Sequence, residues 1–276
     1  RTARHIPRGA DRHSPGPSFP DRSPERLQAS MPWHRRSNRM KLYLTSSPTG
    51  TYLKWDVKEF DGLNPQNGMV EELKKDLDTA DVRCMMIAAF PESYEQNDQM
   101  KADFRERLTE TGFTVSRMSL CDRRNASEMM EELHDHNMII LGGGHVPTEN
   151  AFFAEIGLKE KLNAYNGVVM GISAGTMNCA GTVYAQPEEP GESVDPSYER
   201  FLPGLGLTEI NVLPHYNAVK DFMLDGKRLF EDITYPDSFG HTFYAVTDGS
   251  YILQRDKEVS FRGEIYRISE GRITPV

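Results

Sequence analysis

Cysteine is scarce in this chain of 276 residues, which contains only Cys84, Cys121 and Cys179. Three cysteines give no disulfide framework, and the sequence has neither a C-x-x-C pair nor a cysteine–histidine spacing typical of zinc. We therefore expect no metal and a reducing, cytoplasmic location. The sequence also lacks any run of about 18 apolar residues, so no membrane-spanning helix is predicted.

Positive charge is concentrated in the first 39 residues and is sparse elsewhere. Residues 1–39 hold nine arginines against three acidic residues, a formal charge of +6. Because the whole chain carries −9, residues 40–276 carry −15. An acidic body of this kind predicts no nucleic-acid binding by the folded part.

Residues 1–39 also contain six prolines and almost no apolar periodicity. Such a segment cannot bury enough surface to offset the entropy lost on ordering, so we predict a disordered basic tail. It has no apolar stretch typical of a secretory signal. An upstream translated or expression-derived tail and a basic interaction arm are the two interpretations. Residues 40–276 are predicted to form a single α/β domain.

Residues 40–276 alternate between apolar segments and segments of helical periodicity. The predicted strands cover residues 41–46, 82–89, 113–120, 137–141, 168–170 and 205–213. The predicted helices cover residues 69–77, 97–111, 126–134, 148–156, 174–184 and 218–233. Alternation at this spacing predicts an α/β, flavodoxin-like fold with a mostly parallel sheet and helices on both faces.

Two further segments have their own patterns. Residues 243–276 contain alternating runs separated by turn pairs such as Asp248-Gly249, which predicts C-terminal antiparallel hairpins that finish the sheet. Residues 47–67 form a polar connection of unusual length, which is a candidate lid over the site.

The segment 167–180, GVVMGISAGTMNCA, has the order strand, sharp turn and helix. In a nucleophile elbow the serine lies at the tight turn with its hydroxyl exposed, and glycines two residues to either side avoid clashes. Gly171 and Gly175 flank Ser173 at this spacing, so Ser173 is a candidate nucleophile. The alternative is an ordinary glycine-lined turn with a solvated serine.

A triple glycine followed by His145 comes directly after the predicted strand at 137–141. Glycines there let backbone N–H groups approach a ligand, and the start of the next helix adds partial positive charge. The segment can form half of an oxyanion hole beside Ser173, cradle a phosphate, or be a plain tight turn. Neither G-x-G-x-x-G nor the P-loop Lys-Ser/Thr pair accompanies it.

An activated serine needs a general base and a third group that orients the base. Of eight histidines, His145 and His215 come just after predicted strands, at the edge where open α/β sheets bind ligands. We predict His215 as the base and His145 as a residue that lines the pocket or contacts substrate. Asp248 is the predicted orienting carboxylate. Glu192 and Asp195 are the alternative candidates. They lie on an acidic loop, residues 186–198, where an imidazole is harder to keep in one orientation.

Four motifs carry a family resemblance. They are L-G-G-G-H at 141–145, G-I-S-A-G at 171–175, L-P-H-Y-N at 213–217 and T-D-G at 247–249. In this order on an α/β sheet they resemble the peptidase E (aspartyl dipeptidase) and cyanophycinase family of serine peptidases. The similarity spans residues 40–276 and includes the opening segment MKLYLTSSPTG. It implies a class I glutamine amidotransferase-like fold, in which related enzymes place cysteine at the elbow.

The resemblance implies a role for each site residue. Ser173 would be the nucleophile, His215 the general base and Asp248 the acidic member, where peptidase E itself has glutamate in a Pro-Glu-Gly turn. The N–H groups of Gly144 and Ala174 would form the oxyanion hole.

The resemblance also bears on substrate. Peptidase E cleaves dipeptides with an N-terminal aspartate and holds the acidic side chain with an arginine that follows the histidine. Arg228 is the arginine near that stretch here, with Lys220 and Lys227 as substitutes. The residues expected to contact substrate are Gly143, His145, Asn217 and Arg228.

We therefore expect a cytoplasmic serine peptidase domain that hydrolyses dipeptides or short peptides, with an acidic P1 residue as one option. The partner is a small peptide substrate, and no metal or organic cofactor is required. The alternatives are a non-catalytic small-molecule binding protein of the same fold and an amidohydrolase or esterase. The sequence makes no prediction of oligomeric state.

Overall fold

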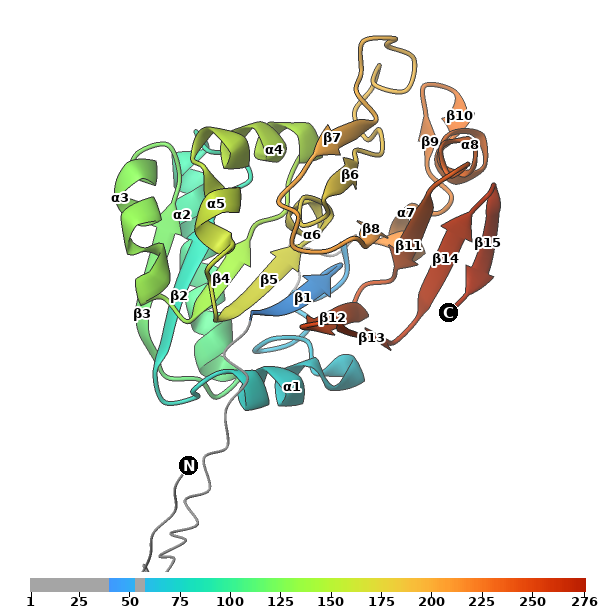
Figure 1. Cartoon of the computed structure of the whole chain (residues 1–276). Helices are drawn as coiled ribbons and strands as arrows, with labels where there is room; N and C mark the ends of the chain where they lie inside the picture. The colour runs from blue at the N-terminus through green and yellow to red at the C-terminus, as the bar shows by residue number, and fades with distance from the viewer. Residues whose placement is uncertain (1–39, 53–57) are drawn as a thin grey trace, which may run out of the picture. The chain divides into compact units, whose positions relative to one another are not determined.

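The computed structural model describes residues 40–52 and 58–276 (Figure 1). The predicted basic tail, residues 1–39, lies outside the described residues. Its disorder, its origin and the division of the chain at residue 40 therefore stay predictions.

The main sheet has seven strands in the order β13-β12-β1-β5-β4-β2-β3. The last five of these are parallel to their neighbours, whereas β12 and β13 extend the sheet in antiparallel fashion beyond β1. The strands are β1 (Lys41–Thr45), β2 (Val82–Ile87), β3 (Val115–Cys121), β4 (Met138–Leu141), β5 (Val168–Ile172), β12 (Tyr251–Arg255) and β13 (Glu258–Arg262). The prediction of a mostly parallel sheet is confirmed.

Helices cover both faces of this sheet (Figure 1). They are η2 (Gln66–Gly68), α1 (Met69–Asp76), α2 (Tyr94–Glu110), α3 (Ala126–Glu132), η3 (Leu133–Asp135), α4 (Val146–Glu155) and α5 (Leu158–Leu162). Alternate strand residues point to opposite faces. Leu44 and the strand side chains on the same face of the sheet pack with α3, α4 and α5. Tyr43 and the strand side chains on the opposite face pack with α1 and α2. Among the helices of the described ranges, none has the length and apolarity needed to cross a bilayer.

A second sheet of four strands has the order β15-β14-β11-β8. Its strands are β8 (Asn211–Leu213), β11 (Thr242–Val246), β14 (Ile265–Ser269) and β15 (Arg272–Pro275). β8 and β11 are parallel, and β14 and β15 follow as an antiparallel hairpin. The predicted C-terminal hairpins are therefore present, but only β12 and β13 extend the main sheet.

The prediction of a helix through residue 184 is wrong. Helix α6 (Ala174–Met177) is short, and residues Thr182–Tyr184 form strand β6, paired with β7 (Phe201–Pro203). The β-branched pair Thr182-Val183 favours an extended backbone. The strand predicted at 205–213 is likewise limited to the three residues of β8.

The prediction of one helix at 218–233 is also wrong. This segment contains α7 (Tyr216–Val219), a hairpin of β9 (Met223–Leu224) and β10 (Lys227–Arg228), the π-helix η4 (Leu229–Thr234) and then α8 (Tyr235–Asp237). Asp225 and Gly226 both have positive φ, 51° and 77°. Such a turn joins two antiparallel strands tightly and cannot continue a helix.

The carboxyl ends of strands from both sheets meet at one place (Figure 1). Ser46 follows β1 and Ser173 follows β5, and these two strands are parallel neighbours. His215 comes two residues after β8, and Asp248 two residues after β11, again a parallel pair. The two sheets thus deliver hydroxyl, imidazole and carboxylate groups to a common edge.

Candidate active site

Ser173 lies at a tight turn between β5 and α6. Its backbone has φ 52° and ψ −113°, a conformation that a residue with a side chain seldom takes. The flanking glycines explain how the turn fits. A Cβ atom on Gly171 would lie 2.6 Å from the Cα of Thr176, and one on Gly175 would lie 2.3 Å from the carbonyl oxygen of Leu141. The turn therefore has the geometry that the elbow motif predicts.

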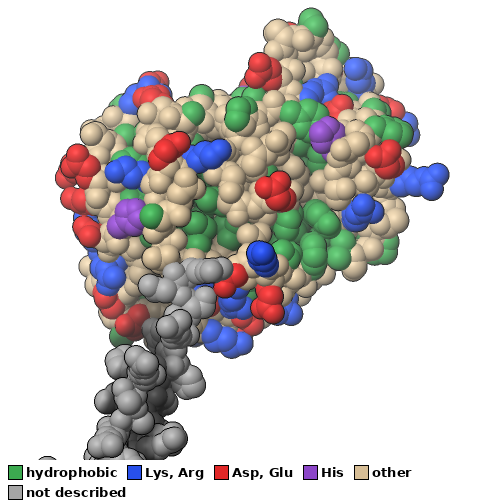
Figure 2. All heavy atoms as spheres, in the orientation of Figure 1, with side chains coloured by type: hydrophobic (Ala, Val, Ile, Leu, Met, Phe, Trp, Pro, Cys, Tyr) green, Lys and Arg blue, Asp and Glu red, His purple; other side chains and the backbone are tan. Residues whose placement is uncertain are grey.

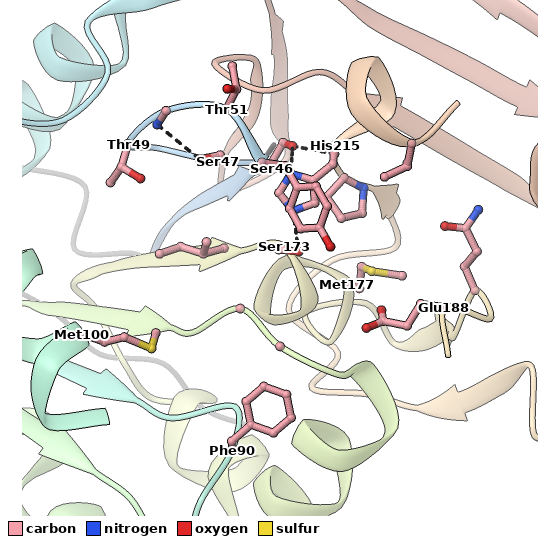
Figure 3. Close-up of a pocket in the computed structure, with 18 of the residues that line it drawn as sticks. Ser46, Ser47, Thr49, Thr51, Phe90, Met100, Ser173, Met177, Glu188 and His215 are labelled. Carbon is pink, nitrogen blue, oxygen red and sulfur yellow. Dashed lines mark hydrogen bonds between the residues drawn. The ribbon is translucent and has the colours of Figure 1, made fainter. Parts of the chain in front are cut away.

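A continuous chain of hydrogen bonds joins the three predicted side chains. Ser173 Oγ lies 2.8 Å from His215 Nε2 (Figure 3). On the other side of the ring, His215 Nδ1 lies 2.6 Å from Asp248 Oδ1. The side chain of Asp248 is 1% exposed. Because Nδ1 faces a carboxylate, Nδ1 carries the ring proton. Nε2 is therefore free to accept the proton of the serine hydroxyl.

The Asp248 carboxyl is ionised despite its burial. Burial by itself raises the pKa of Asp248, but hydrogen bonds from His215, from the N–H of Tyr52 and from Ser46 outweigh this effect and hold its pKa below the usual range. The carboxylate is therefore charged at neutral pH and stabilises a protonated His215.

Ser46 and Tyr52 complete the surroundings of this chain, and sequence reasoning did not identify either. The hydroxyl of Ser46 donates to Asp248 Oδ1 at 2.7 Å and accepts the backbone N–H of His215 at 2.7 Å. The backbone N–H of Tyr52 donates to Asp248 Oδ2 at 2.8 Å, and the Tyr52 ring stacks on the His215 ring at 4.4 Å. The position of Ser46 directly after a strand was the available signal.

The turn that carries the histidine is held by Asn217. His215 has a left-handed backbone, with φ 60° and ψ 26°, and precedes the short helix α7. The side-chain oxygen of Asn217 accepts the backbone N–H of Asp248 at 2.8 Å. Asn217 therefore ties the two loops together, and it is not among the residues that line the cavity described below.

The triple glycine lies against the serine. A Cβ atom on Gly143 would approach the Cβ of Ser173 to 3.3 Å, and one on Gly144 would lie 2.7 Å from the Cβ of Ala89. Within the described residues, the backbone N–H groups of Gly144 and Ala174 have no hydrogen-bond acceptor. Both donors are therefore available to a ligand at this edge.

A cavity of about 1110 Å³ opens in front of Ser173 and His215 (Figure 3). This volume is slightly above the ~300–1,000 Å³ typical of ligand pockets, so a short peptide fits. The loop residues Thr49, Gly50 and Thr51 form part of its wall, in the connection that the sequence marked as a candidate lid.

Three charged residues line this cavity: Glu95, Arg107 and Glu188. The guanidinium of Arg107 is committed to Asp103 and to the carbonyl oxygens of residues 60 and 62, and the residue is 7% exposed. The described wall therefore offers a substrate carboxylate groups but no uncommitted cation.

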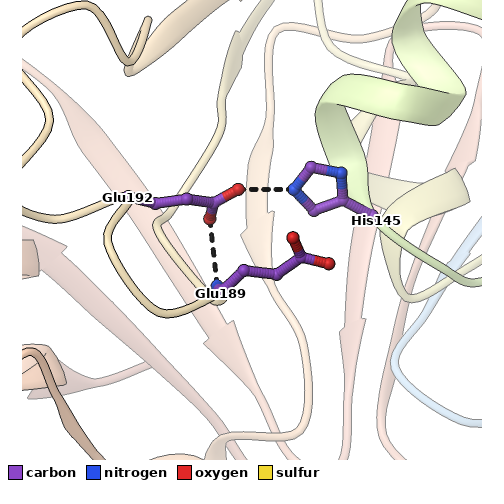
Figure 4. A group of neighbouring side chains, drawn as sticks. All are labelled: His145, Glu189 and Glu192. Carbon is purple, nitrogen blue, oxygen red and sulfur yellow. Dashed lines mark hydrogen bonds and ion pairs between the residues drawn. The ribbon is translucent and has the colours of Figure 1, made fainter.

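His145 lies outside this lining and forms a hydrogen bond with Glu192 instead (Figure 4). Its Nε2 lies 2.6 Å from Glu192 Oε1, and its Nδ1 lies 2.8 Å from Thr148 Oγ1. The second carboxylate oxygen of Glu192 accepts the backbone N–H groups of Glu188 and Glu189 at 2.9 and 3.0 Å. The pair thus anchors the acidic loop to the start of α4.

This cluster also has the composition of a metal site. Ligand atoms of His145, Glu189 and Glu192 lie within 4.8 Å of one another. However, both nitrogens of His145 already have protein partners, and Glu189 is exposed. We therefore interpret the cluster as a loop anchor.

The rival carboxylates and the predicted specificity arginine are also engaged elsewhere. Glu192 binds His145, and Asp195 binds Ser197, so neither orients His215. Arg228 binds Asp232 through its Nε at 3.0 Å and its Nη2 at 2.7 Å. Arg228, Lys220 and Lys227 do not line the cavity.

Below the elbow, Asn178 joins the starts of α4 and α6. Its side-chain nitrogen donates to the carbonyl oxygens of Val146 and Ala174 and to Glu149 Oε2. Glu149 is fully buried, and its Oε1 has no partner within the described structure. Burial raises the pKa of Glu149 well above its usual value.

Comparison with known proteins gives a family match and a fold match. The sequence profile of peptidase family S51 matches residues 70–262, a range that contains Ser173, His215 and Asp248. Among curated proteins, no sequence match is found.

Two solved structures are similar to this chain. A peptidase from an acI-B1 Actinobacterium superimposes with a TM-score of 0.57 at 14% identity, covering 86% of this chain and 93% of the other. A protein from Listeria monocytogenes EGD-e that carries the provisional description peptidase E superimposes with a TM-score of 0.52 at 17% identity, covering 80% and 97%. At these identities the likeness shows the shared fold.

Proposed function

Because this chain belongs to peptidase family S51, we propose that it is a serine peptidase that hydrolyses short peptides. Ser173 is the nucleophile, His215 the general base and Asp248 the group that orients the base. The observation that carries this proposal is the 2.8 Å contact from Ser173 Oγ to His215 Nε2, with Asp248 on the opposite ring nitrogen.

The reaction follows from these positions. His215 takes the hydroxyl proton as Ser173 attacks the peptide carbonyl, and Asp248 stabilises the imidazolium that forms. The N–H groups of Gly144 and Ala174 stabilise the oxyanion. His215 then gives its proton to the leaving amine, and water, activated by the same histidine, releases the acyl group from Ser173.

The cavity bears on the choice of substrate. Its volume supports a peptide of a few residues rather than a folded protein. Because Arg228 is held by Asp232 and does not line the cavity, nothing in the described wall favours an acidic P1 residue. The three cysteines are free and buried, which supports a reducing, cytoplasmic location.

Labelling with a fluorophosphonate, combined with a panel of dipeptides and tripeptides, tests this function. We expect labelling of the wild-type protein at Ser173 that is lost in Ser173→Ala and strongly reduced in His215→Ala. Ser197→Ala, which removes an exposed serine of the acidic loop, is the matched control and keeps both labelling and hydrolysis.

Several outcomes contradict the proposal. Labelling that survives in Ser173→Ala places the nucleophile elsewhere. Hydrolysis of esters or simple amides without hydrolysis of any peptide favours an esterase or amidohydrolase. Tight binding of an anionic ligand without labelling favours a non-catalytic binding protein.

A further inference from the structure

Glu188 lies in the wall of the cavity that contains Ser173, and its carboxylate points into that cavity (Figure 3). The backbone of this residue is fixed from both sides. Before it, the buried Gln186 donates to Thr234 Oγ1 at 2.7 Å, and Pro187 restricts the chain. After it, Glu192 accepts the backbone N–H groups of Glu188 and Glu189. The anchor of the acidic loop therefore holds Glu188 in place.

The Glu188 carboxylate has no protein partner within residues 40–52 and 58–276. It makes no hydrogen bond and no ion pair there, whereas two acidic residues close to it do. Glu192 is bound to His145, and Glu149 is bound to Asn178. The Glu188 side chain is exposed to the cavity, so a ligand can reach it.

The charge of Glu188 acts on Tyr52, the residue that stacks on the proposed catalytic histidine. The ring of Tyr52 stacks on His215, and burial raises the pKa of the Tyr52 phenol. The negative charges of Glu188 and Asp248 raise that pKa further. Glu188 is therefore within electrostatic reach of the ring that covers the catalytic imidazole.

We propose that Glu188 binds a positively charged ammonium group of the peptide substrate, either the α-ammonium of its N-terminal residue or a basic side chain. This inference rests on the proposed peptidase function and specifies its substrate class. Among the described residues the Glu188 carboxylate is fixed and unpartnered, and the cavity wall offers no uncommitted cation. A cationic ligand group would satisfy such a carboxylate, whereas an acidic group would be repelled.

The surroundings of Glu188 predict how this contact responds to pH. Partial loss of surrounding water at the cavity wall raises the pKa of Glu188 to about 7, the negative charges of Glu192 and Glu189 add to the increase, and His145 opposes it. Tyr52, Tyr198 and the buried Glu149 also face this charge. Glu188 is therefore negative mainly above pH 7, and peptide α-ammonium groups lose their proton near pH ~7.7–8.0. Recognition of an α-ammonium is strongest between these values.

The test compares wild type with Glu188→Gln on four substrates that share one fluorogenic leaving amine. Their acyl groups are Ala, N-acetyl-Ala, Lys and N-acetyl-Lys. We expect Glu188→Gln to lower kcat/KM about 10- to 100-fold for substrates whose ammonium group is recognised, and to leave N-acetyl-Ala unchanged. Loss with Ala identifies the α-ammonium as the ligand, and loss confined to the two Lys substrates identifies the side chain.

Glu189→Gln is the matched control, because it makes the same charge change one residue away on a side chain that does not line the cavity. At a pH where Glu188 is ionised in both proteins, we expect Glu189→Gln to retain wild-type kcat/KM on all four substrates. Equal kcat/KM for wild type and Glu188→Gln on the Ala and Lys substrates overturns the inference and leaves the peptidase function standing.

A binding measurement separates failure of the inference from failure of the function. In a Ser173→Ala background, calorimetry compares Ala-Ala with N-acetyl-Ala-Ala, with and without Glu188→Gln. A third peptide, N-acetyl-Lys-Ala, carries only the side-chain ammonium. We expect Glu188→Gln to weaken binding of Ala-Ala or of N-acetyl-Lys-Ala and to leave N-acetyl-Ala-Ala unchanged. If the wild-type protein hydrolyses nothing, this experiment still decides the ammonium site, because equal affinities of the two proteins for both ammonium-bearing peptides overturn it.

Discussion

The backbone N–H of His215 donates to the hydroxyl of Ser46 at 2.7 Å, across 169 positions of sequence. The same hydroxyl donates to Asp248, so one side chain fixes both the histidine backbone and the carboxylate that orients its ring. Ser46 is therefore a positioning residue for the proposed general base, His215.

Ser46→Ala tests this role. Removing the hydroxyl leaves the buried N–H of His215 without its acceptor and removes one hydrogen bond to a charged carboxylate. We expect kcat to fall about 10-fold with little change in KM, and the pH profile of kcat to shift. Ser47→Ala, on the neighbouring side chain, serves as the control. An unchanged kcat and pH profile in Ser46→Ala would show that the contact is only structural.

Asp248→Asn changes the orienting group without changing its size. The amide nitrogen favours the wrong tautomer of His215, and kcat should fall by about 10⁴-fold. Stability should change as well. The lowered pKa of Asp248 means that its charge stabilises the fold above the unfolded value of about 3.9 and that this contribution is lost as the pH falls further. Unfolding midpoints of the two proteins should therefore differ at pH 7, and the difference should shrink as the pH falls below about 3.9.

Tyr52→Ala removes the ring that stacks on His215 and keeps the backbone N–H that binds Asp248. We expect kcat/KM to fall about 2- to 10-fold, the range expected for one aromatic contact. Tyr52→Phe retains the ring and should remain close to wild type. Similar losses in both variants would assign the effect to the hydroxyl instead.

Arg228→Ala examines the specificity expected from the family resemblance. Because the guanidinium is exposed and bound to Asp232, we expect kcat/KM for Asp-containing and neutral dipeptides to stay within about twofold of wild type. A selective loss with Asp-containing dipeptides would mean that Arg228 reaches the substrate after all.

Glu149→Gln concerns stability rather than activity. With its pKa raised, Glu149 holds a proton in the folded state that the unfolded chain releases above pH ~4.3. The folded state thus binds more protons, and stability declines as the pH rises through this range. We expect Glu149→Gln to remove this part of the decline. The unfolding free energy of the variant, measured relative to wild type in urea titrations, should therefore increase from pH 5 to pH 8. Parallel curves for the two proteins would contradict the assignment.

The convergence of Ser173, His215 and Asp248 was predictable from sequence, because each follows a strand and the carboxyl ends of parallel strands share an edge. Ser46 also follows a strand, but a serine at that position does not by itself indicate a residue that positions a base. Tyr52 acts through a backbone N–H and a ring contact from a loop, and neither leaves a pattern in the sequence. Arg228 was named from family resemblance alone, and its partner Asp232 lies four residues further along the chain.

The fold was predictable to a similar degree. Buried parallel strands have continuous apolar sequences, so the main sheet was clear from its pattern. The sequence pattern of residues 243–276 predicts that neighbouring strands pair as hairpins. It does not specify which sheet each hairpin joins. The helix predicted at 218–233 failed because two turn residues, Asp225 and Gly226, override the apolar spacing on either side.

The division of the strands between two sheets has a consequence for the synthesis of the protein. Ser173 belongs to the larger sheet, whereas His215 and Asp248 extend from the smaller one. On the proposed roles, a chain emerging from the ribosome carries the nucleophile before it has a base, and the Ser173 hydroxyl would stay unreactive until residue 248 has been made and the second sheet has docked. Peptidase activity would then appear late, as a property of the finished molecule only.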